Sequence, residues 1–134
     1  MMTTGAPKED VQDRHERSLN MIQLIGRAGC DPRIGGQKQE NQVVLFSLAT
    51  NEYYGGGSTD TTTQQRVDWH RISVFRPHLK QQVEQFLRQG DRIYVKGRIH
   101  YDLVGDSATK SDSKYVTSVV ADELIFLGRP KQSE

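Results

Sequence analysis

The stretch VDWHRISVF, residues 67–75, alternates in character from one residue to the next and is the clearest strand in the sequence. Successive side chains of a strand point to opposite faces. One face therefore carries Asp68, His70, Ile72 and Val74, and the other carries Val67, Trp69, Arg71, Ser73 and Phe75. Two rings that flank a guanidinium suit stacking against unpaired bases whose phosphates need neutralising. The alternative is that Trp69 is an ordinary core residue, because Trp and Phe usually pack inside.

The elements on either side of this stretch indicate a small barrel. Further strands are expected over residues 19–27, 43–50, 91–100 and 115–127, with a bulge or bend at Gly26 and a bend near Ala121-Asp122. After Arg76-Pro77, apolar residues at i, i+4, i+7 and i+8 predict one short helix that is capped by Gly90. Four or five strands with a helix between the third and fourth predict an all-β fold, the five-stranded oligonucleotide-binding Greek-key barrel.

Composition limits the function. The 134 residues carry a net charge of only +1 and have a mean hydropathy of −0.70, so any phosphate-binding surface must be local. The single Cys30 excludes an intramolecular disulfide and a Cys-based zinc site. No apolar run approaches the roughly 18 residues that span a membrane, and we expect any organelle signal to have been removed. Asp68 and His70 lack a nucleophile or third ligand, so we predict no enzyme, no metal and no cofactor.

Two polar loops and one basic strand could complete a nucleic-acid surface. The Gly-rich loop 53–66 has Tyr53 and Tyr54 at its root and could fold over a ligand, or it could be an exposed linker. A second loop, 101–114, begins with Tyr101. The strand expected over residues 91–100 alternates cleanly between apolar and polar residues. Its largely basic face is either a track for phosphates or a solvated surface, and it consists of Arg92, Tyr94, Lys96, Arg98 and His100.

Several segments together resemble the single-stranded DNA-binding proteins of bacteria and mitochondria. The similarity runs from about residue 17 to residue 128 and is greater toward the mitochondrial branch. The matching segments are RSLN (17–20), GRAGCDP (26–32), FSLATNE (46–52), WHRISVF (69–75), GDRIYVKG (90–97) and IFL (125–127). The resemblance implies a homotetramer that binds single-stranded DNA independently of sequence during mitochondrial DNA replication, in the matrix or nucleoid. A replication polymerase or helicase is a further expected partner.

The resemblance also assigns roles to residues. Base stacking falls on Trp69, Phe75 and Tyr54, and subunit contacts fall on His70 and Tyr94. Together with the reading of the residues themselves, this gives two sets. The stacking set is Trp69, Phe75, Tyr54, Tyr53 and Tyr101, and the phosphate-contacting set is Arg27, Arg71, Arg76, Lys96 and Arg98. The expected organisation is a flexible arm over 1–16, a DNA-binding domain over 17–128 and a short tail over 129–134.

Two departures from the family pattern matter. Val104 stands where an aromatic residue is frequent, and the odd spacing argues against Tyr101 as a simple replacement. The long tail with which bacterial members recruit other proteins is not seen, so no such recruitment is predicted. The alternative function is a protein-interaction or assembly module on the same barrel without DNA-binding activity, and a nucleotide-directed barrel enzyme is a weaker one.

Overall fold

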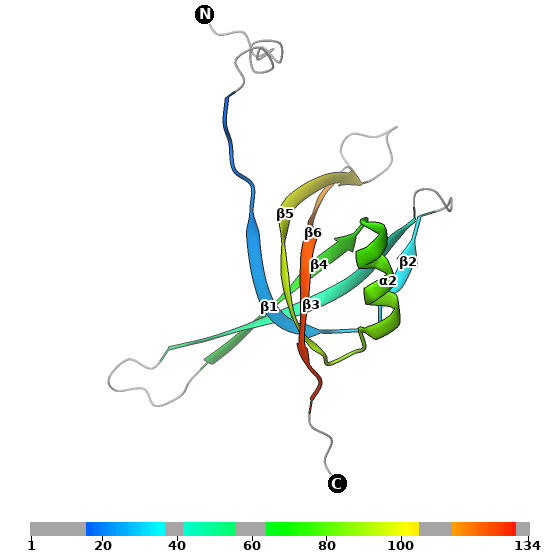
Figure 1. Ribbon diagram of the computed structural model, residues 1–134. Helices are drawn as coiled ribbons and strands as arrows, with labels where there is room; N and C mark the ends of the chain where they lie inside the picture. Colours follow the sequence, from blue (N-terminus) through cyan, green and yellow to red (C-terminus); the bar gives the residue numbers. More distant parts are fainter. Residues whose placement is uncertain (1–15, 37–41, 56–63, 105–113, 131–134) are drawn as a thin grey trace, which may run out of the picture.

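The strands of this protein close into a barrel that carries two projecting hairpins (Figure 1). The structure is a computed structural model, and it describes residues 16–36, 42–55, 64–104 and 114–130. The strands are β1 (Ile22–Ala28), β2 (Arg33–Gly35), β3 (Val43–Tyr54), β4 (Gln64–Val74), β5 (Arg92–Val104) and β6 (Lys114–Gly128). The helix α2 (Pro77–Phe86) lies between β4 and β5.

Five long strands form the closed barrel. Neighbouring strands follow the order β1-β5-β6-β4-β3, and a short pairing of β1 with β3 closes the ring. All of these pairs are antiparallel except β4 with β6, which run parallel where Ile72 faces Val119 and Ser73 faces Val120. Short β2 pairs only with β3. The predicted five-stranded oligonucleotide-binding barrel, with its helix between the third and fourth long strands, is confirmed.

Two glycines allow the strands to coil this tightly. A Cβ on Gly26 would clash with the Ala49 carbonyl oxygen, because β1 leaves β5 there and crosses onto β3. A Cβ on Gly97 would clash with the Val120 carbonyl oxygen, next to the register shift at which Lys96 pairs with Glu123 and Gly97 pairs with Ala121. The shift leaves Asp122 as the extra residue of a bulge. The bends predicted at Gly26 and at Ala121-Asp122 are therefore both present.

The core lies inside the barrel and beneath the helix. Ile72 and Val74 from the opening stretch are fully buried, as predicted, beside Ile93 and Val95 of β5. Alternation thus separates inward from outward residues on both strands. The helix contributes Leu79 and Val83 to the same core, and Leu87 follows just after its end.

The helix end differs from the prediction. Pro77 stands at the first helical positions as expected, but the helix ends at Phe86 with Leu87 as its cap, so Gly90 is not the C-cap. Gly90 instead occupies a turn with φ of 92°, and its N–H donates to the Ala28 carbonyl. Arg88 binds the last carbonyls through its guanidinium, including that of Glu84 at 3.2 Å. The end of this helix is thus satisfied by a side chain rather than by a glycine.

Strands also extend into segments that were predicted as loops. β3 continues to Tyr54, β4 begins at Gln64, and β5 continues to Val104. Both hairpins therefore project from the barrel as paired strands, while their tips, 56–63 and 105–113, lie outside the described residues together with most of the predicted arm and tail. Among the residues that are described, no helix is long and apolar enough to cross a membrane.

Candidate nucleic-acid interface

Trp69 projects from the outer face of β4 and is 62% exposed, so it is not the core residue of the alternative interpretation. In the β3–β4 ladder Trp69 lies opposite Ala49, and Arg71 lies opposite Ser47. Opposed residues of an antiparallel pair share a face. The small Ala49 and Ser47 side chains therefore leave the Trp69 ring and the Arg71 guanidinium standing above the sheet.

A hollow of about 270 Å³ lies beside Trp69. We call it the Trp69 hollow; its lining consists of Cys30, Arg33, Leu45, Phe46, Ser47, Trp69, His70 and Arg71. One edge of the indole lies directly over Gly29, where a Cβ would collide with ring atom Cζ3. The ring can lie against the Gly29 backbone only because Gly29 has no side chain. Arg71 and Arg33 add two cations to the lining of the same hollow. Such an arrangement can hold a base against the ring and a phosphate against the guanidinium groups.

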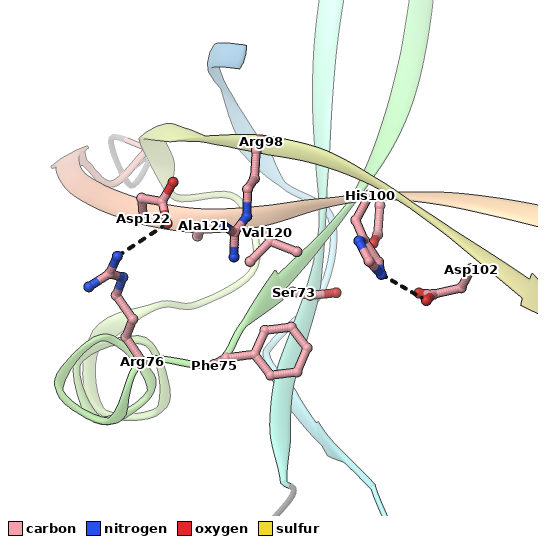
Figure 2. Close-up of a pocket in the computed structure, with 10 residues that line it drawn as sticks. Ser73, Phe75, Arg76, Arg98, His100, Asp102, Val120, Ala121 and Asp122 are labelled. Atoms are coloured by element: carbon pink, nitrogen blue, oxygen red, sulfur yellow. Dashed lines mark hydrogen bonds and ion pairs between the residues drawn. The ribbon is translucent and has the colours of Figure 1, made fainter. Parts of the chain in front are cut away.

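A second hollow of about 410 Å³ lies beyond the end of β4, next to Phe75 (Figure 2). We call it the Phe75 hollow; its lining consists of Ser73, Phe75, Arg76, Arg98, His100, Asp102, Ser118, Val120, Ala121 and Asp122. Phe75 is 52% exposed. Arg76 pairs with Asp122 at 3.4 Å, whereas Arg98 has no ion-pair partner among the described residues. His100 Nε2 lies 3.0 Å from Asp102 Oδ1.

The three predicted tyrosines lie on the hairpins and do not share one face. Tyr53 and Tyr54 are adjacent in β3, so they point to opposite sides of the β3–β4 hairpin. Tyr53 lies on the same face of the hairpin as Trp69. Tyr101 alternates with His100 and therefore points away from the Phe75 hollow. It shares its side of the β5–β6 hairpin with the exposed Leu103 and Tyr115. The structure thus brings only Tyr53 onto the face of Trp69.

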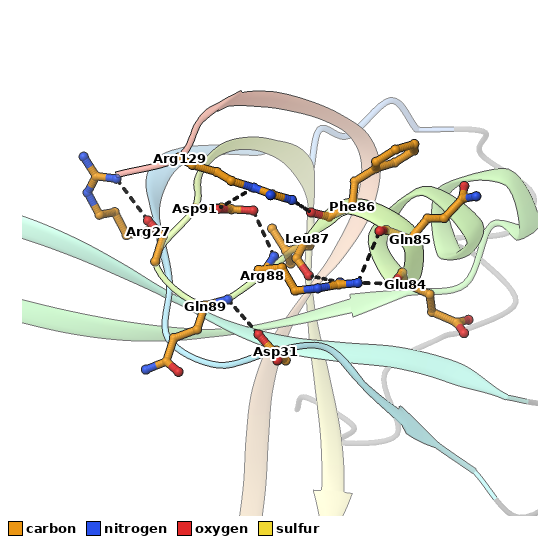
Figure 3. Close-up of polar contacts among 11 residues, drawn as sticks. Arg27, Asp31, Glu84, Gln85, Phe86, Leu87, Arg88, Gln89, Asp91 and Arg129 are labelled. Atoms are coloured by element: carbon orange, nitrogen blue, oxygen red, sulfur yellow. Dashed lines mark hydrogen bonds and ion pairs between the residues drawn. The ribbon is translucent and has the colours of Figure 1, made fainter. Parts of the chain in front are cut away.

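The remaining predicted cations are divided in the same way. Arg27 lies opposite Ala49, which in turn lies opposite Trp69, so the Arg27 side chain continues the row of the indole. Its Nη1 donates to the Gly90 carbonyl at 3.0 Å, within the polar contacts drawn in Figure 3. Lys96 lies between Gln23 and Glu123 and lines neither hollow. Of the predicted basic row of β5, only Arg98 and His100 line the Phe75 hollow, because the strand coils around the barrel.

The side chains of the two predicted interface residues do not share the face of the Trp69 ring. His70 is half-buried on the opposite side of β4 from Trp69, where its Nε2 lies 2.8 Å from Thr50 Oγ1. Tyr94 is half-buried on the outer face of β5, directly between Ile25 of β1 and Ile125 of β6. Those two isoleucines are 49% and 46% exposed. The result is an apolar row across three strands, the kind of surface that partner chains cover.

Sequence reasoning missed several residues of this interface. Arg33 lines the Trp69 hollow from β2, a three-residue strand that the Gly-rich and polar surroundings concealed. Ser118 lines the Phe75 hollow from β6, whose many apolar residues suggested only core. Ser73 was expected on an exposed face, but it lies at the floor of the hollow and is 7% exposed. Among the described residues, no group of three His, Cys, Asp or Glu side chains could hold a metal ion.

Comparison with known proteins agrees with this geometry. Residues 19–127 match the model of the "Single-strand binding protein family". The mitochondrial single-stranded DNA-binding protein of Oryctolagus cuniculus is 42% identical over 117 residues, covering 84% of this chain and 77% of the relative. The Drosophila melanogaster protein of the same description is 39% identical over 111 residues, covering 83% and 73%. A solved Plasmodium falciparum SSB complex with ssDNA matches with a TM-score of 0.72 and 35% identity, covering 84% of this chain and 98% of that one.

Proposed function

The chain belongs to the single-strand binding protein family, and from this membership we propose that it binds single-stranded DNA independently of sequence. It would coat and protect the unpaired strand during mitochondrial DNA replication, and it would act by binding rather than by catalysis. The observation that carries the proposal is the Trp69 hollow, which an exposed indole and two arginines line together on an open sheet face. Every base has a face that can stack on such a ring, so stacking on Trp69 does not depend on sequence.

Trp69 and Phe75 are the proposed central stacking residues, because each stands exposed at the edge of its own hollow. Tyr53 would extend the Trp69 face along the hairpin, whereas Tyr54 and Tyr101 would contact DNA only if the strand wraps around the hairpins. Arg71, Arg98 and Arg27 are the proposed phosphate contacts. Arg76 would contribute less while Asp122 remains paired with it.

Assembly into a homotetramer is part of the proposal. The apolar row of Ile25, Tyr94 and Ile125 supports it, because a partner subunit would bury a surface that water otherwise covers. His70 is the second proposed subunit contact. Residues 17–128 would form the DNA-binding domain, with 1–16 and 129–134 as flanking segments. Localisation to mitochondria, in the matrix or nucleoid, is proposed from the relatives, and replication polymerase or helicase partners are proposed on the same basis.

One titration tests the DNA-binding function. Trp69 is the only tryptophan, so its fluorescence reports on one site in each subunit. Oligo-dT should quench this emission strongly, duplex DNA should quench it far less, and added salt should weaken the binding. If no quenching occurs and single-stranded DNA is not retarded in a gel, the assembly-module alternative replaces the proposal.

Sedimentation tests the assembly separately. The wild-type chain should sediment as a tetramer, and Tyr94→Asp should dissociate it by placing a charge within the apolar row. A Lys96→Asp variant is the matched control, because Lys96 lies two residues along the same strand face beside polar neighbours. Equal sedimentation of the wild type and Tyr94→Asp would contradict the proposed interface.

A further inference from the structure

Two serine hydroxyls at the floor of the Phe75 hollow form no hydrogen bond with any residue that the structure describes. Ser73 is 7% exposed and Ser118 is 4% exposed, and neither forms a hydrogen bond among the described residues. In the described part of the chain, every fully buried side-chain oxygen or nitrogen has a hydrogen-bond partner. Because the two serine hydroxyls have none there, they are not fully buried and must be open to the hollow. Polar groups that are open to a hollow are hydrogen-bonded by water, and a ligand that enters can take the place of that water. The two hydroxyls are therefore available to a ligand with polar groups at its edge.

The two hydroxyls come together only in the folded barrel. Ser73 of β4 pairs with Val120 of β6 in the parallel ladder, two residues along the strand from Ser118. Ser118 in turn faces His100 of β5 across the antiparallel ladder. Figure 2 shows the Ser73 hydroxyl between the Phe75 ring and the pair formed by His100 and Asp102.

A carboxylate stands at the far wall of the hollow. Asp102 Oδ1 lies 3.0 Å from His100 Nε2, and the second carboxylate oxygen remains available to accept a hydrogen bond. A negative group is unexpected in a site for DNA phosphates, since it repels them. It is expected where a base presents an amino group, because Asp accepts from the N4 amino group of cytosine.

We propose that the Phe75 hollow reads the edge of a base stacked on Phe75 and favours cytosine over thymine. This inference rests on the proposed DNA-binding function and adds a base preference to it. The cytosine edge offers one amino donor for Asp102 and two acceptors that the Ser73 and Ser118 hydroxyls can serve. Thymine would place its O4 acceptor toward the carboxylate, and a polar site discriminates strongly against a base that leaves its groups unpaired.

The charges around the hollow are compatible with this placement. Arg98 lines the hollow without an ion-pair partner among the described residues, so it can contact the phosphate of the base held there. The Arg76 charge is paired with Asp122 at 3.4 Å. Because Arg76 neutralises Asp122, Asp102 is the carboxylate proposed to accept a hydrogen bond from the base. Removal of the Asp102 carboxylate should therefore change the base preference most.

The test compares oligo-dC with oligo-dT of equal length for each variant. The measured quantity is the ratio of the two Kd values, because Asp102→Ala removes a negative charge and should strengthen binding of both oligonucleotides. We expect Asp102→Ala and the double variant Ser73→Ala/Ser118→Ala each to shift the ratio toward oligo-dT by about two- to tenfold, the range of one hydrogen bond. Thr117→Ala is the matched control, since Thr117 is exposed and adjacent to Ser118 on the other face of β6.

The outcomes are distinguishable. If both test variants stay folded by circular dichroism and keep the wild-type ratio, base reading is refuted, while quenching of Trp69 by oligo-dT still supports DNA binding. If neither oligonucleotide quenches Trp69 in the wild type, the proposed function fails and the base preference fails with it. A ratio that shifts equally in Thr117→Ala would also overturn the proposal, because the effect would then not come from the hollow.

Discussion

Gly29→Ala should weaken DNA binding although Gly29 itself need not contact DNA. A Cβ at this position would collide with Cζ3 of Trp69, and it would lie 3.0 Å from Cη2 and 2.7 Å from Ser47 Oγ. Carbon atoms in good contact lie about 3.5–4.0 Å apart, so the indole must move by about 1 Å or more. A rigid ring that moves this far no longer presents the same stacking face.

The size of the effect follows from the value of one stacked base. Base–aromatic stacking contributes about 1–3 kcal/mol per base, which corresponds to roughly 5- to 140-fold in Kd if the contact is lost completely. Partial loss should give a value toward the lower end. Fluorescence anisotropy of labelled oligo-dT measures Kd, and a shift of the Trp69 emission maximum should accompany the change.

Gly35→Ala is the matched control for this variant. It makes the same chemical change on β2, but the nearest atom to the new Cβ is the flexible end of Leu45 at 3.0 Å. Both variants should keep a cooperative thermal unfolding transition. If Gly29→Ala binds oligo-dT with wild-type Kd and emission, Trp69 is either not seated on Gly29 or not a stacking residue.

Three further changes probe the scaffold that holds the interface. Gly97→Ala should lower the free energy of unfolding by about 3 kcal/mol or more, because the new Cβ would press on the Val120 backbone. Urea denaturation measures this free energy, and a loss below about 1 kcal/mol would contradict the prediction. Asp91→Asn should cost about 1.5–3 kcal/mol in the same assay, since the buried carboxylate accepts from the Arg88 N–H at 2.9 Å and pairs with Arg129 at 3.4 Å, as Figure 3 shows. Asn20→Ala should speed exchange of the Ile99 amide hydrogen, which donates to Asn20 Oδ1 at 2.9 Å, while amides of the core strands keep their protection; equal exchange at Ile99 would disprove the bridge.

Alternation within each strand was readable from the sequence because it is a local property of the backbone. The exposed Trp69 and Arg71, the buried Ile72 and Val74, and the inward row of β5 all follow from a period of two. The same rule divides Tyr53 from Tyr54 and Tyr101 from Arg98. The order of strands around one helix was likewise sufficient for the barrel, because few topologies accommodate it.

Which outward residues become neighbours was decided only by the tertiary structure. Ser73 and Ser118 line the same hollow because β4 pairs with β6, and Gly29 lies under Trp69 because β1 crosses onto β3. Lys96 and Arg98 share a strand face, yet the bulge and the coiling of β5 around the barrel bring only Arg98 to the Phe75 hollow. Periodicity specifies the direction of each side chain, whereas the register between strands distant in sequence specifies its neighbours, and that register exists only once the barrel has closed.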